Sequence, residues 1–110
     1  MRAYELAREE ARNYKLKGSK PDVALMLDAL GDWKRRKMIL RLQKGGAMSL
    51  SKLIEPFGMT LPAGLKHLHL LERAGIVTTH KRGRIRFCVF NPRSLKTLSA
   101  HLTSQYLTKE

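Results

Sequence analysis

Residues 49–75 read SLSKLIEPFGMTLPAGLKHLHLLERAG, and they carry the most regular pattern in the chain. Ser49 is a residue type that begins helices, and apolar side chains follow it at the spacing of one helical face: Leu50, Leu53, Ile54 and Phe57. Gly58 supplies the left-handed backbone that a tight turn needs. Thr60 then begins a second helix, with Pro62 in its first turn and Gly75 at its end. We therefore predict a helix, a short turn and a helix, which is the helix-turn-helix pattern.

Two runs rich in β-branched and aromatic residues follow, and they predict a β-hairpin over residues 76–80 and 85–90. The connection between them holds three cations around one glycine: Lys81, Arg82, Gly83 and Arg84. We interpret the hairpin as a wing whose basic tip lies against DNA phosphates or in the minor groove. The alternative is a solvated loop, since hairpin tips are usually polar.

Helices are also expected on both sides of this unit. Before it, the apolar periodicity predicts three helices, over residues 2–16, 22–30 and 32–44. After it, Asn91 followed by Pro92 begins a C-terminal helix. The apolar stripe of this helix has heptad-like spacing: Leu95, Leu98, Leu102 and Tyr106. Such a seam packs on its own domain or on a second subunit. Because the chain is short and the N-terminal helix is also available, we expect the seam to form a dimer interface.

Charge is the most informative part of the composition. The chain has 22 Lys and Arg residues against 9 Asp and Glu residues, a net charge of +13. The basic side chains concentrate in residues 31–44 and 60–93, whereas acidic ones gather near the N-terminus. A surplus of this size repels itself unless the usual partner is a polyanion, and nucleic acid is the commonest polyanion. A generally basic surface, as in some thermophile proteins, is the alternative.

Length and composition narrow the class of protein. A chain of 110 residues with 43% hydrophobic residues suits one packed domain rather than a disordered tail. No apolar run reaches the ~18 residues of a membrane span, and the N-terminus lacks the apolar stretch of a secretory signal. The single cysteine, Cys88, fits a reducing cytosol and is expected to be a small core residue. We therefore expect a cytoplasmic, nucleoid-associated protein.

These elements predict a mostly α-helical fold with one small β-hairpin, a winged helix-turn-helix that dimerises through its N- and C-terminal helices. The expected divisions are an N-terminal helix and linker at 1–20, a DNA-binding domain at 21–92 and a dimerisation helix at 93–110. The expected partners are double-stranded DNA and a second copy of the chain, without a cofactor.

The stretch from Ile39 to Pro92 resembles the ArsR-type winged-helix repressors, particularly members without an obvious metal site. The most specific block is KHLHLLERAGIV at residues 66–77, and it is supported by EPFGMTLPA at 55–63 and RGR at 82–84. The resemblance spans about half of the chain without a gap. It implies a sequence-specific regulator, a homodimer that binds a palindromic operator and represses transcription.

The resemblance also implies which residues meet DNA. The helix that begins at Thr60 would enter the major groove, with Thr60 and His67 as phosphate donors, and the hairpin tip would contact the DNA backbone. Together, the expected DNA-binding residues are Thr60, Leu61, Pro62, Leu65, Lys66, His67, Lys81, Arg82 and Arg84.

Three departures from the family pattern have consequences. Gly64 stands where relatives carry a bulky apolar residue, and a glycine inside a helix costs about 1 kcal/mol relative to alanine, so we expect a softer or re-registered helix. Leu61 and Leu65 stand where relatives often carry polar groups, which favours readout through thymine methyls and DNA shape. The helix before the motif aligns only with about one extra residue, which leaves the roles of Arg35 and Arg36 open.

Metal sensing, catalysis and non-specific binding are the alternatives. The family's metal sensors use paired cysteines in the first helix of the motif, or Asp and His on the C-terminal helix. Residues 49–57 hold no Cys or His, and the C-terminal helix offers His101 as its one imidazole, so no metal site is expected. No phosphate-binding Gly-rich loop, carboxylate pair or nucleophile–histidine set points to an enzyme. The main competing function is an architectural protein that coats DNA without sequence preference.

Overall fold

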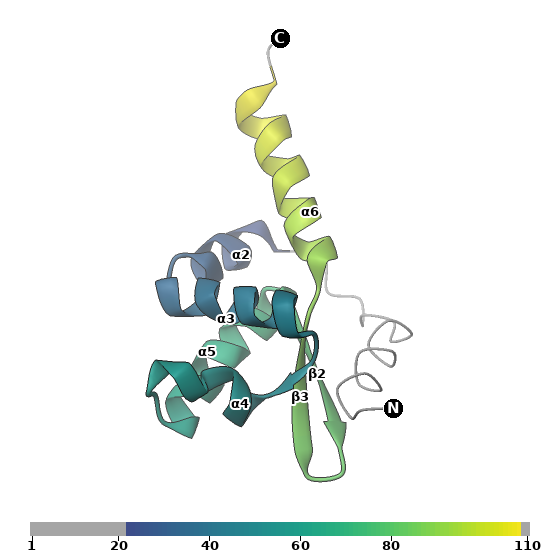
Figure 1. Ribbon diagram of the computed structural model, residues 1–110. Helices are drawn as coiled ribbons and strands as arrows, with labels where there is room; N and C mark the ends of the chain where they lie inside the picture. The colour runs from purple at the N-terminus through teal and green to yellow at the C-terminus, as the bar shows by residue number, and fades with distance from the viewer. Residues whose placement is uncertain (1–21, 109–110) are drawn as a thin grey trace.

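The computed structural model describes residues 22–108, which form helices around a small antiparallel sheet (Figure 1). The helices are α2 (Val23–Leu30), α3 (Trp33–Gly45), α4 (Leu50–Ile54), α5 (Leu61–Arg73) and α6 (Pro92–Leu102). A 3-10 turn, η1 (Glu55–Phe57), follows α4, and a π-helical turn, η2 (Thr103–Leu107), continues α6. The strands are β1 (Met48–Ser49), β2 (Val77–Arg82) and β3 (Ile85–Phe90). This arrangement confirms the predicted winged helix-turn-helix, while the helix predicted over residues 2–16 lies outside the described residues.

Residues close together in the sequence determine where the helices begin and where α4 and α5 are separated. The α-helices start behind side chains that accept a hydrogen bond from a backbone N–H of the first turn: Asp22, Asp32, Ser49, Thr60 and Asn91. Gly58 has a φ of 62°, a left-handed conformation that ends η1 and redirects the chain into α5. The two helices of the motif are therefore set by residues next to each other in the chain.

The sheet has three strands in the order β1-β3-β2, one more than the predicted hairpin. The additional strand, β1, pairs with β3 through Met48 opposite Cys88 and Ser49 opposite Phe87. A strand of two residues shows no alternating pattern, and its partner lies far along the chain, so only tertiary pairing reveals it. β2 also extends to Arg82, into the predicted turn.

The core lies between the helices and one face of the sheet. Its fully buried side chains are Met26, Met38, Leu42, Leu53, Leu68, Leu71, Ile76, Val77 and Cys88. Burying a large apolar side chain contributes about 1.5–3 kcal/mol, so this set supplies most of the packing that holds α5 against α4 and the base of the sheet. The predicted burial of Cys88 is confirmed.

Helix α6 projects away from the other helices, at the opposite end of the molecule from the hairpin tip (Figure 1). Leu98 is only 6% exposed and lies in the core of its own domain, with Leu95 and Leu102 partly buried against that core. Tyr106, in contrast, is 76% exposed. Leu98 therefore places most of its side chain in the core of its own domain, and the seam expected for the dimer stays a prediction.

Candidate nucleic-acid interface

Helix α5, the recognition helix of the motif, has one face in the core and one face in solvent. Gly64 and Leu68 are buried, whereas Leu61 is 50% exposed and Pro62 and Lys66 are also exposed. Leu61, Pro62 and Lys66 lie in the first half of the helix, which is the part that reaches base edges when such a helix enters a major groove. Three of the predicted contact residues are thus accessible to DNA.

Two other predicted contact residues of this region also stabilise the protein. The hydroxyl oxygen of Thr60 accepts a hydrogen bond from the backbone N–H of Ala63 at 3.3 Å, and its hydroxyl hydrogen is a separate donor. Leu65 is half-buried and packs against the core. Leu65 therefore borders the exposed surface, and only part of its side chain can reach a base.

Gly64 lies where α4 and α5 approach each other closely. A Cβ atom on this residue would lie 2.8 Å from Cδ1 and 2.9 Å from Cγ2 of Ile54. Helix α5 continues unbroken through this position. The glycine, which suggested a soft helix from sequence alone, is explained by close packing of the two helices of the motif.

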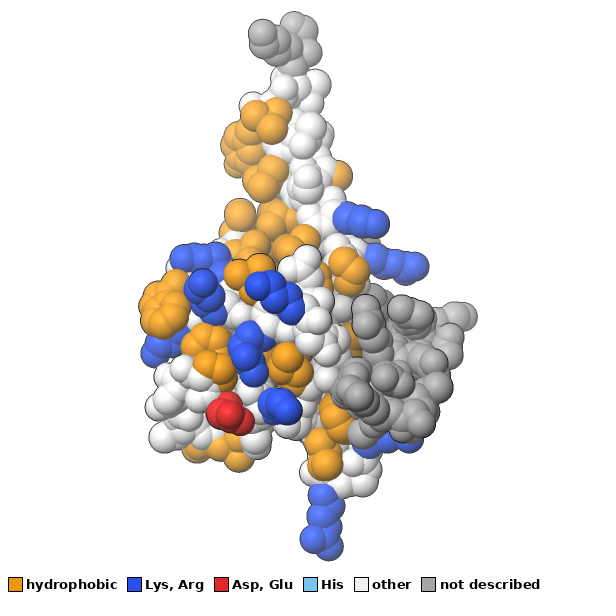
Figure 2. All heavy atoms as spheres, viewed as in Figure 1, with side chains coloured by type: hydrophobic (Ala, Val, Ile, Leu, Met, Phe, Trp, Pro, Cys, Tyr) orange, Lys and Arg blue, Asp and Glu red, His pale blue; other side chains and the backbone are white. Residues whose placement is uncertain are grey.

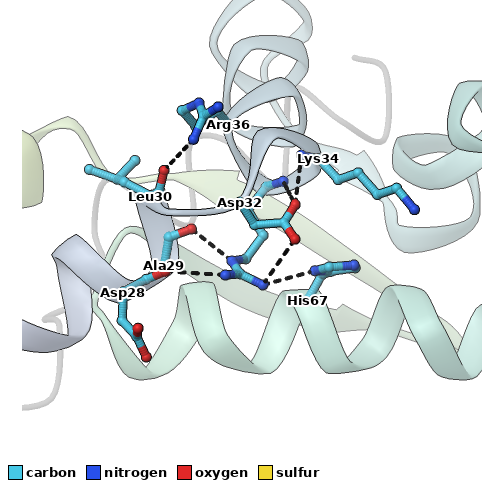
Figure 3. A network of polar contacts seen from close by, with 8 residues as sticks. Asp28, Ala29, Leu30, Asp32, Lys34, Arg36 and His67 are labelled. Carbon is cyan, nitrogen blue, oxygen red and sulfur yellow. Dashed lines mark hydrogen bonds and ion pairs between the residues drawn. The ribbon is translucent and has the colours of Figure 1, made fainter.

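Arg35 connects three helices (Figure 3). Its Nε donates to the carbonyl oxygen of Ala29 at 2.7 Å and its Nη2 to that of Asp28 at 3.1 Å, both near the end of α2. Its Nη1 lies 3.1 Å from Nδ1 of His67 on α5 and 4.0 Å from a carboxylate oxygen of Asp32. The role of Arg35, which the sequence left open, is to join α2 and the start of α3 to the recognition helix.

Arg36 and Asp32 complete this junction. Nη1 of Arg36 donates to the carbonyl oxygen of Leu30 at 2.7 Å. Two arginines therefore donate to carbonyl groups in the last turn of α2, where the Asp28 carbonyl also accepts from the backbone N–H of Gly31. Burial by itself would raise the pKa of the Asp32 carboxyl. The backbone N–H groups of Lys34 and Arg35, together with nearby positive charge, outweigh burial and hold this pKa below its ordinary value of 3.8. The junction therefore contains a carboxylate that stays ionised at neutral pH.

The wing presents a pair of cations on the side that faces α5. Lys81 lies directly opposite Arg86 across β2 and β3, and both side chains are exposed. Because alternate residues of a strand share a face, this pair lies on the same face as Thr79, whose hydroxyl donates to Glu72 of α5 at 3.1 Å. Arg86 was absent from the predicted site, although the register of the hairpin reveals it.

The other predicted wing residues differ in their surroundings. Gly83 has a φ of 58° and allows a tight turn, and Arg84 is exposed at the tip. Arg82 is half-buried and pairs with Ile85, so it lies on the opposite face of the ribbon from Lys81. The predicted tip cations therefore do not form one cluster.

Further basic side chains cover the face of the molecule over α3 (Figure 2). The sequence of this helix has no acidic residue, and it holds six basic ones: Lys34, Arg35, Arg36, Lys37, Arg41 and Lys44. A surface with this excess of one sign produces a positive field that attracts a polyanion from solution.

Cys88 and the carboxylates do not form a reactive centre in the part of the chain that the structure describes. Burial raises the pKa of the Cys88 thiol to about 12, and the negative charge of Glu72 contributes to the same shift. Among residues 22–108, no three His, Cys, Asp or Glu side chains are grouped as a metal site would require. No helix in this range is long and apolar enough to cross a bilayer.

Comparison with known proteins agrees with this geometry. No family model matches the chain. It is 36% identical over 76 residues to an uncharacterized HTH-type transcriptional regulator, YuzN of Bacillus subtilis (strain 168), which covers 64% of this chain and 83% of that protein. It is 35% identical over 63 residues to the transcriptional repressor SdpR of the same organism, covering 57% of this chain and 69% of that protein. Among solved structures, an ArsR family transcriptional regulator superposes with a TM-score of 0.70 and 37% identity, over 76% of this chain and 90% of that one.

Proposed function

The chain belongs to the ArsR family of winged helix-turn-helix transcriptional regulators, and we propose that it represses transcription as a homodimer bound to a palindromic operator in the cytoplasm. The observation that carries the proposal is the exposed first half of α5, together with the exposed Lys81–Arg86 pair on the face of the wing that packs on α5. The name of the relative SdpR, a transcriptional repressor, supports repression as the direction of the effect.

Each half-site is bound by one α5 in the major groove. Leu61 is suited to contact a thymine methyl group, and Lys66 to contact a base edge or a phosphate. The wing cations bind the neighbouring backbone without reading sequence. The proposed contact residues are Thr60, Leu61, Pro62, Leu65, Lys66, His67, Lys81, Arg82, Arg84 and, from the strand register, Arg86.

The second subunit is proposed to pack on the surface formed by α2 and the outer part of α6. These two helices contact each other, and Figure 2 shows apolar side chains along one side of α6 down to its base. Leu27 of α2 is 49% exposed, and Tyr106 and Leu107 are 76% and 73% exposed. Exposed apolar groups of this size on a helix that projects from its domain are stabilised by a partner helix. Two subunits joined in this way read half-sites about one helical turn of DNA apart.

Capture and sequencing of the genomic fragments that the protein binds would test this function. The recovered fragments should share a palindrome, and the protein should bind it at least about a thousandfold more tightly than a scrambled duplex at the same salt concentration. Addition of the protein to transcription from the associated promoter should lower the transcript. Equal affinity for palindrome and scrambled duplex would instead support an architectural protein, and a higher transcript level would make it an activator.

A further inference from the structure

We infer that Arg35 positions His67 for DNA binding by holding its imidazole in the tautomer that carries the proton on Nε2. This inference rests on the proposed function, since it concerns how the recognition helix presents a donor to a phosphate. It starts from the distance of 3.1 Å between Nη1 of Arg35 and Nδ1 of His67 (Figure 3).

The chemistry of the two groups decides the tautomer. A guanidinium has donors and no acceptor, so Nδ1 of His67 must offer its lone pair to Arg35. A neutral imidazole carries one proton, which therefore resides on Nε2. Nε2 is the other nitrogen of the ring and is separated from Nδ1 by one ring carbon, so it remains available to a second partner. Phosphate oxygens accept hydrogen bonds, and this tautomer offers them an N–H, whereas the other tautomer would offer them a lone pair.

Arg35 can orient His67 because its own side chain is fixed. Its Nε and Nη2 donate to the carbonyl oxygens of Ala29 and Asp28, and its Nη1 lies 4.0 Å from the Asp32 carboxylate. The Asp32 carboxylate is in turn held by the backbone N–H groups of Lys34 and Arg35. A donor that is oriented before DNA arrives loses less conformational entropy on binding. Arg35 is thus a positioning residue that acts through His67.

The tautomer can be measured without DNA. Long-range ¹H–¹⁵N spectra of the imidazole rings, near pH 8 on the full chain, should show His67 as the Nε2–H tautomer. Arg35→Met removes the donor and keeps an apolar stem, so the His67 signals should shift toward a mixture of tautomers. Arg36→Met is the matched control, because Arg36 donates to the same end of α2 at Leu30, and it should leave the His67 signals unchanged. A wild-type ring protonated on Nδ1 would overturn the inference.

Affinity for the captured palindrome supplies the second readout. His67→Asn keeps an amide oxygen near the position of Nδ1 but has no donor at Nε2, whereas His67→Gln places an amide nitrogen near Nε2. A hydrogen bond to a charged phosphate corresponds to about tenfold or more in affinity, so His67→Asn should lose about tenfold per half-site and His67→Gln clearly less. Arg35→Met should lose less than His67→Asn, because a mixture that still contains the Nε2–H tautomer lowers affinity only in proportion to the fraction of that tautomer. The double variant should lose no more than His67→Asn alone.

Additive losses in the double variant, or an equal loss in Arg36→Met, would contradict a role through His67. If Arg35→Met does not fold, the test relies on the tautomer of the wild type and on the comparison of His67→Asn with His67→Gln. If the wild type binds all duplexes equally, the proposed function is wrong. The inference about the tautomer is still tested in that case, because the spectrum is recorded on the free protein.

Discussion

A Cβ atom on Gly64 would lie 2.8 Å from Cδ1 of Ile54, so the two helices of the motif approach each other at a point where a larger residue does not fit. Ile54 is itself only 5% exposed and is branched at Cβ, so its side chain has few other conformations available. This contact limits how closely α4 and α5 can approach each other.

Gly64→Ala should therefore destabilise the protein by about 1 kcal/mol, since the cost of overpacking, about 1–3 kcal/mol, exceeds the gain of about 1 kcal/mol in helix propensity. Chemical denaturation of the wild type and the variant measures the difference. The same substitution in an Ile54→Ala background, which lacks both Cδ1 and Cγ2, should cost clearly less. An equal cost in both backgrounds would show that Ile54 is not the reason for the glycine.

The wing pair should affect affinity more than stability. Lys81 and Arg86 are like charges directly opposite each other, an arrangement that destabilises a hairpin in the absence of a polyanion. Replacing both with alanine should leave the unfolding free energy unchanged or slightly higher, while affinity falls by similar factors for all DNA sequences. The plot of log affinity against log salt should flatten by about 0.9 for each phosphate that the variant no longer neutralises.

Arg84→Ala at the hairpin tip should also lower the affinity for all DNA sequences by similar factors and flatten the salt plot. Lys96→Ala on α6, at the other end of the molecule from the tip, is the matched control and should keep the salt slope (Figure 1). If a wing variant keeps the wild-type slope of log affinity against log salt, the wing is not part of the DNA interface.

Substitutions at exposed apolar residues can test dimerisation without disturbing the fold of the monomer. Leu27→Glu and Tyr106→Glu change side chains that are 49% and 76% exposed, so each monomer should remain folded while the dimer dissociates. Light scattering and circular dichroism together check both parts. Leu98→Glu should instead unfold the protein, because it buries a charge in the core. A wild-type chain that is monomeric in solution would disprove the dimer.

The thiol of Cys88 should be unreactive while the protein is folded. With a pKa raised from 9.0 to about 12, the thiol stays protonated in the folded state at pH values where the unfolded chain ionises it. The stability from this difference is complete below about pH 9 and is lost as the pH rises toward 12. The unfolding free energy of Cys88→Ala should therefore vary less between pH 9 and 11 than that of the wild type. Fast alkylation of the native protein at pH 8 would contradict this.

Metal ions should not control DNA binding. The sequence places no cysteine or histidine in residues 49–57, and the described residues hold no cluster of three ligand side chains. Stoichiometric zinc, cadmium or arsenite should leave the affinity for the operator unchanged, with EDTA-treated protein as the control. A tight complex of one metal per subunit that releases DNA would refute the prediction.

The predictable parts of the site are those with a local cause. Thr60 begins α5 because its side chain accepts a hydrogen bond three residues ahead, and Gly58 turns the chain because its φ is positive. Both depend on neighbours in the chain, as does the apolar stripe of α4. The helix-turn-helix and the exposed positions of Leu61 and Lys66 could therefore be predicted from the amino-acid sequence.

The winged helix-turn-helix, the strong positive charge and the family all follow from the amino-acid sequence alone, because caps, turns and periodicity act within a few residues. Tertiary packing was needed to establish that Leu98 packs inward and that Gly64 accommodates Ile54. It also brings Arg35 to His67, a residue on another helix whose distance along the chain hides the contact. The cause is the same in each case: these relationships join segments that meet only after the core has formed, and a one-dimensional pattern carries no information about which side chain fills which space.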